Sequence, residues 1–190
     1  MELSIRSVEP GDADAIVRIL NPIIEARVFT VFDTPLTPEA EREFIANFPE
    51  RGIFHVAVRQ TDQRIVGFQN LEPLATYTRA LDHVGVVGTY VDLDVRRQGV
   101  ARRLFEATLG TARRKGYDKI FTFVRADNQA ALQTYLKQGF HIIGTAHRHA
   151  RIDGRYVDEI LIEKWLEDPA AASGTIESGA KPEPGEPAPS

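Results

Sequence analysis

The first part of the chain alternates between strand-like and helix-like spacing of apolar residues. Apolar and polar side chains alternate over residues 3–8, which is typical of a half-buried β-strand. Asp12 then stands at the N-cap position of a segment whose isoleucine and leucine residues recur at helical spacing. Thr37-Pro38-Glu39 indicates the start of a second helix, because proline fits the first helical position. We therefore expect one strand followed by two helices.

The middle of the chain has the pattern of three strands. Residues 53–59 and 64–71 are rich in aliphatic and aromatic side chains, and the short polar turn between them predicts an antiparallel hairpin. Residues 83–93 are dominated by valine and contain Gly85 and Gly88. A glycine inside a strand marks a bulge or the close approach of another backbone.

The remaining elements alternate between helix and strand before a final hairpin. In chain order we expect a helix at 99–115, a central strand at 119–124, a helix capped by Asn128 and closed by Gly139, and strands at 141–151 and 155–165 around Asp153-Gly154. The predicted fold class is α/β (α+β), with a mixed, largely antiparallel sheet of about seven strands and flanking helices.

Composition predicts one folded domain and a tail. A chain of 190 residues that is 43% hydrophobic buries one core, which we place at 1–166. Residues 167–190 are rich in proline, glycine, alanine and glutamate, so we expect them to be disordered. The first twenty residues carry charges where a signal peptide needs an apolar stretch, and no apolar run reaches membrane-spanning length, so a cytoplasmic protein without membrane contact is expected. Cysteine is absent, which excludes a cysteine nucleophile.

The charge distribution indicates an anion site rather than a nucleic-acid surface. The formal net charge is −4, which argues against general nucleic-acid binding. Basic residues nevertheless crowd the segment 96–115, where Gly99 follows a strand and opens a helix. A glycine there lets backbone N–H groups face a pyrophosphate, although an ordinary helix start with surface arginines explains the loop equally well.

Two longer segments change that balance. Residues 87–101 and 128–140 together resemble the signature of the GNAT acetyltransferase superfamily. In that superfamily the pattern Arg/Gln-x-x-Gly-x-Gly/Ala binds the pyrophosphate of coenzyme A, and Arg96, Gly99 and Ala101 occupy its defined positions.

The resemblance extends over nearly everything except the tail. Segments at Asn21, Thr37 and Asp153 are similar to the phosphinothricin acetyltransferase-like branch, to which L-amino acid N-acyltransferases belong. It implies the GNAT fold, acetyl-CoA as cofactor and, from the branch, a homodimer.

The resemblance also implies the cofactor site and the acid catalyst. Main-chain groups of the valine-rich strand would hold the acetyl and pantetheine arm, the loop amides would cradle the phosphates, and an asparagine would contact the arm. The residues assigned in this way are Thr89, Tyr90, Val91, Arg97, Gln98, Gly99, Val100, Ala101, Arg102 and Asn128. Tyr135 would lie near the sulfur and protonate the departing thiolate, whereas the alternative is an aromatic side chain packed in the core.

The general base is harder to assign. Relatives often carry a glutamate in the strand before the Tyr-Val pair, where this chain has Val86 and Val87. We take Asp92 and His83 as the catalytic candidates alongside Tyr135. The other candidates are Glu72, His147, His149 and Asp158, and for every one a solvated or paired side chain is the alternative. No metal site is expected, because His147-x-His149 lacks a partnered third ligand.

The sequence thus predicts an acetyl-CoA-dependent N-acetyltransferase that acts on the primary amine of a small molecule, such as an amino acid or a phosphinothricin-like compound. Two alternatives stay open. A protein or peptide N-acetyltransferase would need an open peptide groove. A non-catalytic coenzyme-A-binding regulatory protein would explain the missing glutamate.

Overall fold

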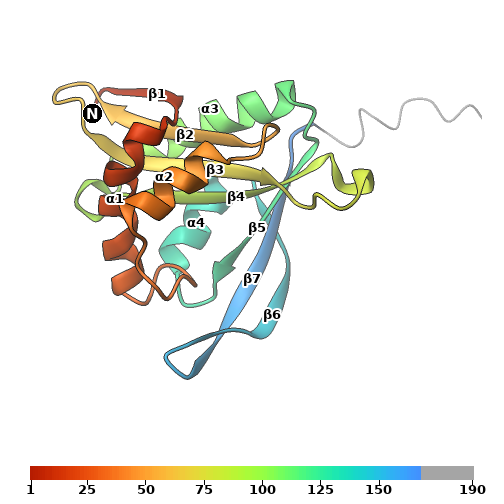
Figure 1. The fold of residues 1–190 in the computed structure, drawn as a ribbon. Coiled ribbons are helices and arrows are strands. Elements are labelled where there is room, and N and C mark those ends of the chain that lie inside the picture. Colours follow the sequence, from red (N-terminus) through yellow and green to blue (C-terminus); the bar gives the residue numbers. More distant parts are fainter. Residues whose placement is uncertain (168–190) are drawn as a thin grey trace, which may run out of the picture.

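The strands form one sheet that carries helices on both faces (Figure 1). The computed structural model describes residues 1–167. The strand order is β1-β2-β3-β4-β5-β7-β6. The strands are β1 Leu3–Ser7, β2 Ile53–Arg59, β3 Ile65–Pro73, β4 Val84–Val91, β5 Lys119–Arg125, β6 His141–Ile152 and β7 Arg155–Trp165. Each lies within two residues of its predicted position, so the expected mixed sheet of seven strands is confirmed.

Two helices are capped by the side chains that the sequence indicated, whereas Asp12 makes no capping bond to the first helix and accepts hydrogen bonds from the Glu9 N–H and Arg6 instead. The helices are α1 Ala13–Glu25, α2 Pro38–Ala46, α3 Val100–Arg114 and α4 Gln129–Lys137, with 3-10 turns η1 Pro10–Asp12, η2 Arg79–Leu81 and η3 Leu93–Val95. The Thr37 hydroxyl accepts a hydrogen bond from the Ala40 N–H at 3.2 Å, and the Asn128 side-chain oxygen accepts one from the Ala131 N–H at 3.2 Å. These bonds satisfy backbone donors that a helix start leaves free.

The apolar faces of the helices define two core layers. Helices α1 and α2 cover one face of the sheet, where residues such as Ile16, Phe54 and Phe68 pack together. Helices α3 and α4 cover the other face, around Phe105 and Ile120. The sheet is thereby buried between the two helical layers over its central strands.

Strands β4 and β5 form the only parallel pair in the described sheet, and they separate early. Their register covers three residue pairs, from Val84 opposite Lys119 to Val86 opposite Phe121. Both strands continue beyond this point, β4 to Val91 and β5 to Arg125. The sheet therefore opens between β4 and β5, while β4 stays paired with β3 on its other side.

The glycines inside β4 serve close packing against β3. A Cβ at Gly88 would lie 2.6 Å from the Asn70 side-chain oxygen, and one at Gly85 would lie 2.6 Å from Leu71 Cδ2. The sequence predicted a bulge or the close approach of another backbone at these glycines. The structure shows a close side chain of β3 instead, and the β3–β4 register has no bulge there.

Two further predictions concern the C-terminal tail and membrane-spanning helices. Apart from Glu167, the tail predicted at 167–190 lies outside the described residues. Within residues 1–167, no helix is both long enough and apolar enough to cross a membrane.

Candidate active site

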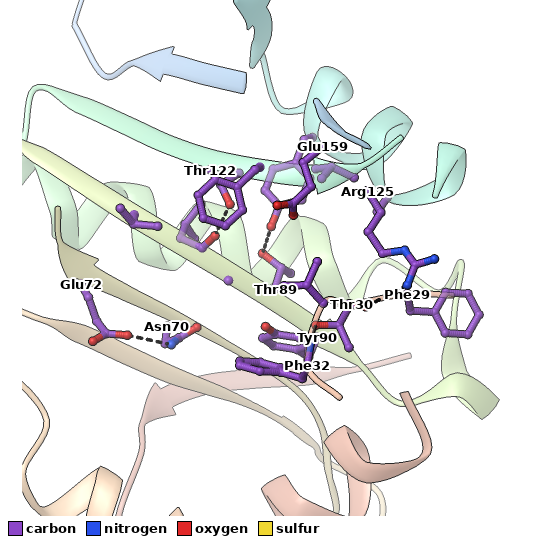
Figure 2. Close-up of a pocket in the computed structure, with 18 residues that line it drawn as sticks. Phe29, Thr30, Phe32, Asn70, Glu72, Thr89, Tyr90, Thr122, Arg125 and Glu159 are labelled. Carbon is purple, nitrogen blue, oxygen red and sulfur yellow. Dashed lines mark hydrogen bonds between the residues drawn. The ribbon is translucent and has the colours of Figure 1, made fainter. Parts of the chain in front are cut away.

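A cleft of about 280 Å³ lies where β4 and β5 separate. We call it the β4–β5 cleft. It is lined by residues 86–90 of β4 and 122–125 of β5, by Ala131 and Tyr135 of α4, by Asn70, Glu72 and Glu159 of β3 and β7, and by residues 29–32 after α1. Figure 2 shows Glu72 beside Asn70 on the left of the view, Glu159 at the top, and Arg125 and Phe29 on the right. The cleft thus brings Tyr135 and Glu72 from the sequence-based candidates to one opening.

Main-chain groups of β4 point into the cleft. The Thr122 hydroxyl donates a hydrogen bond of 2.8 Å to the Val87 carbonyl, which shows that this carbonyl faces β5. Because main-chain groups of successive strand residues point to alternate edges, those of Thr89 and Val91 face the same opening. Beyond Val86 the strand has no partner on this edge, so these N–H groups can bind a carbonyl oxygen.

Tyr135 reaches the cleft from α4. Its hydroxyl lies 3.2 Å from Thr89 Oγ1, which also accepts a hydrogen bond of 2.7 Å from the side-chain amide of Gln69. Burial raises the pKa of Tyr135 to about 12, so the phenol holds its proton at neutral pH. The ring also packs edge-on against Phe105 and Phe140. The structure thus gives Tyr135 both a packing role and a proton beside β4.

The loop before α3 has the geometry of an anion cradle. Arg97 and Gly99 adopt left-handed backbone conformations, with φ of +60° and +83°. No side chain of the described residues caps α3, and the first helical bond here runs from the Arg103 N–H to the Gly99 carbonyl at 3.1 Å. The amides of Val100, Ala101 and Arg102 are therefore unused donors at the positive end of a fifteen-residue helix. These donors fit a pyrophosphate.

Asn128 and Arg96 are committed to the segment that forms one wall of the cleft. The Asn128 side chain caps α4 with its oxygen and donates from its nitrogen to the Phe29 carbonyl at 3.1 Å. The Arg96 guanidinium lies over the Phe29 ring at 4.0 Å. Both polar groups of the Asn128 side chain are thus bonded to the protein, and they hold this wall against the start of α4.

Neither Asp92 nor His83 lines the β4–β5 cleft. Asp92 accepts hydrogen bonds from Arg64 at 2.8 Å and Arg18 at 3.4 Å, and it caps η3 through the Asp94 N–H. His83 precedes β4 at the opposite end from the cleft, where its carbonyl accepts hydrogen bonds from two backbone N–H groups. The ion pairs give Asp92 a structural role that its position in the sequence did not reveal.

The histidines of β6 also lie outside the lining. His147 bonds Asp158 at 2.9 Å, and both side chains are substantially exposed. His149 lies 3.8 Å from the Glu159 carboxylate. No cluster of three potential metal ligands occurs among residues 1–167.

Two carboxylates do line the cleft, and only one of them was a candidate from the sequence. Glu72 on β3 lies directly opposite Val86 of β4, and burial raises its pKa. Glu159 on β7 lies opposite Arg125, is 3% exposed, and burial raises its pKa too. The sequence of β7 offered little signal for Glu159, because Glu163 on the same strand is a buried carboxylate as well and lies outside the cleft lining.

Comparisons with known proteins bear on the family and the fold of the chain. The family described as "Acetyltransferase (GNAT) family" matches residues 21–140. The "Putative phosphinothricin acetyltransferase YwnH" of Bacillus subtilis is 26% identical over 166 residues, which cover 86% of this chain and 99% of that protein. The crystal structure of a GNAT-family acetyltransferase from Streptococcus pneumoniae is 28% identical, covers 87% of this chain and all of its own, and superposes with a TM-score of 0.76.

A third comparison bears on the fold alone. A phosphinothricin acetyltransferase from Sinorhizobium meliloti, solved in complex with acetyl-CoA, is 16% identical and superposes with a TM-score of 0.80. The match covers 87% of this chain and 89% of that one.

Proposed function

The chain belongs to the acetyltransferase (GNAT) family, and we propose that it transfers an acetyl group from acetyl-CoA to the primary amine of a small molecule. Acetyltransferase activity is the property of the family. The observation that carries the proposal is the β4–β5 cleft, in which unpaired main-chain groups of β4 and the Tyr135 hydroxyl meet.

Acetyl-CoA supplies the acetyl thioester when it is bound. The amides at the start of α3 bind its phosphates, and the strand residues Thr89, Tyr90 and Val91 bind its arm. The left-handed Gly99 is part of this assignment, because an added Cβ there would project into open space beside the amides. The cofactor assignment retains all the residues proposed from the sequence, including Asn128, whose side chain also holds the Phe29 wall.

The β4 amides and Tyr135 have two separate roles toward the thioester. A free N–H of β4 stabilises negative charge on the carbonyl oxygen that is attacked, as preorganised donors do in acyl transfer. Tyr135 keeps its proton because burial raises its pKa, and it can donate that proton to a sulfur leaving group.

Glu72 is the base on the acceptor side. It is the one base candidate from the sequence that lines the cleft. Its position opposite Val86 places a carboxylate on β3 beside the point of β4 where relatives carry their glutamate. Burial raises the pKa of Glu72, which brings a carboxylate closer to the range in which it accepts a proton from an ammonium group.

The names of similar proteins suggest which class of acceptor molecule should be tested first. An amino acid or a phosphinothricin-like amine is the acceptor that the relatives suggest. A peptide acceptor would have to pass the wall of Phe29, Thr30 and Phe32 that borders the cleft. A catalytically inactive coenzyme-A-binding protein is the second candidate, and the valine at position 86 favours it.

Release of coenzyme A from acetyl-CoA, followed across amino acids, phosphinothricin, polyamines and short peptides, separates these functions. Turnover with small amines supports the proposal. Turnover with peptides alone would replace it with protein acetylation. Binding of acetyl-CoA without any turnover would support the inactive binding protein.

Three further expectations stay proposals. They are a cytoplasmic location, a folded domain that ends near residue 166, and a homodimer. Light scattering of the purified protein tests the dimer, and limited proteolysis followed by mass spectrometry tests the domain boundary.

A further inference from the structure

The two carboxylates of the cleft lie on the same face of the sheet. On β3, Glu72 shares its face with Phe68, which packs in the core formed with α1. Arg125 of β5 points to that same face, because its guanidinium donates to the carbonyls of Arg27 and Thr30 in the segment after α1. Glu159 lies directly opposite Arg125 in the register, so it shares this face too.

The opening between β4 and β5 separates these carboxylates, so that they approach the cleft from opposite sides. Glu72 comes from β3, beyond β4, and Glu159 comes from β7, beyond β5. Figure 2 shows Glu72 on the left of the lining residues and Glu159 at the top, well apart from it.

Neither carboxylate forms an ion pair with a lysine or an arginine in the described structure, although the charge of Arg125, opposite Glu159 in the register, offsets part of the effect of burial on the pKa of Glu159. Glu72 accepts a hydrogen bond from the neutral amide of Asn70 at 3.3 Å. Glu159 is almost fully buried, and His149, which is charged only when protonated, lies 3.8 Å away. Burial raises the pKa values of both glutamates, because it disfavours their ionised forms. A cation that binds beside them would favour the ionised carboxylates and would in turn be stabilised by them.

The arginine that lines the cleft is already occupied. Arg125 bonds Asp127 through Nε and Nη2 at 2.9 and 2.6 Å, and its Nη1 donates to two backbone carbonyls. Arg96, which stacks on the Phe29 ring, is not among the residues that line the cleft. Among the described residues that line the cleft, no cation is therefore left to bind the carboxylate of an amino acid.

A third acceptor atom lies near Glu72. The side-chain oxygen of Asn70 is buried and has no donor within the described structure. It faces Gly88, at which a Cβ would lie only 2.6 Å away. This end of the cleft is therefore lined with acceptors and suits a group rich in N–H donors.

We propose that the acceptor is a diamine or polyamine without a carboxylate, whose reacting amine lies at Glu72 and whose second ammonium group lies at Glu159. The proposal rests on the acetyltransferase function proposed above and, among small-molecule primary amines, favours cationic amines without a carboxylate over amino acids. A charged hydrogen bond at a half-buried site discriminates by about 10- to 100-fold, and an unpaired carboxylate of the acceptor facing two glutamates adds repulsion in the same direction.

Matched acceptors test the proposal on the unmodified full-length protein. The compounds 1,4-diaminobutane and ornithine differ by one carboxylate, as do 1,5-diaminopentane and lysine. Coenzyme A release at pH 8 gives kcat/KM for each. We expect each diamine to exceed its amino acid by at least about tenfold. Equal values, or a preference for the amino acids, would overturn the inference while leaving the acetyltransferase function intact.

A variant pair locates the second ammonium site. Glu159→Gln should reduce the preference for 1,4-diaminobutane over butylamine by about tenfold, because butylamine has no second charge to bind. Glu163→Gln is the control, since Glu163 is a buried carboxylate of the same strand face that pairs with Lys119 outside the cleft lining. An unchanged preference in folded Glu159→Gln contradicts the assignment. If no amine of any class is acetylated although acetyl-CoA binds, the proposed function itself fails.

Discussion

Replacing Gly99 with alanine tests the phosphate loop with the least disturbance to the fold. Gly99 has a φ of +83°, where an L-amino acid costs about 1–2 kcal/mol. The added Cβ would meet no atom within 4 Å, so no steric clash with the protein adds to this backbone cost. We expect the free energy of unfolding of Gly99→Ala to fall by about 1–2 kcal/mol, as measured by urea denaturation.

The effect on the cofactor should be larger than the effect on stability. The new methyl group stands beside the free amides at the start of α3, and the strained loop shifts to relieve its conformation. Loss of one charged hydrogen bond to a phosphate costs about 1.5–3 kcal/mol, which corresponds to a rise in KM for acetyl-CoA of roughly 10- to 100-fold. Initial rates at varied acetyl-CoA measure the rise, and calorimetric titration gives the matching change in Kd.

The opposite end of α3 offers a matched control. Gly116 has a φ of +78°, and a Cβ there would also meet nothing within 4 Å. Gly116→Ala should lose similar stability while keeping the KM for acetyl-CoA. If both variants raise KM equally, the effect comes from destabilisation, and if Gly99→Ala leaves KM unchanged, the loop does not bind the phosphates.

The remaining predictions concern the catalytic side chains. Tyr135→Phe should lower kcat by about 100-fold with little change in the KM for acetyl-CoA. In the control Tyr117→Phe, which removes a buried hydroxyl bonded to a backbone carbonyl elsewhere, only stability should fall. If Tyr135→Phe has the kcat of the unmodified protein, Tyr135 is a packing residue. Burial raises the pKa of Glu72, and the base works only when it is ionised, so kcat/KM should fall as the pH drops through a value above the ordinary glutamate range. Glu72→Gln should lower kcat/KM by about 100-fold or more and remove this acidic limb of the pH profile. If the variant keeps the acidic limb, another group causes it. Asp92→Asn should destabilise the fold by weakening the pairs with two arginines while turnover per folded molecule survives, and lost turnover in a folded variant would restore Asp92 as the base.

Local sequence patterns were sufficient to predict the helices, the strands and the loop that we assign to cofactor binding. Strand alternation, helix caps and hairpin turns are set by neighbouring residues, so their positions agree with the structure within about two residues. The phosphate loop was also visible, because Gly99 and the helix that it opens are contiguous in the chain. Tyr135 was placed in the same way, on a helix whose cap and end are local features.

The acceptor side was decided only by tertiary structure. Glu72 and Val86 become neighbours through the β3–β4 register, and Glu159 enters the cleft because β7 pairs with β5. Asp92 was a catalytic candidate from the sequence, but in the structure it forms ion pairs with two arginines from distant segments. The cleft itself exists because β4 and β5 share only three residue pairs before they separate, and the separation of two strands that lie almost thirty residues apart leaves no local mark in the sequence.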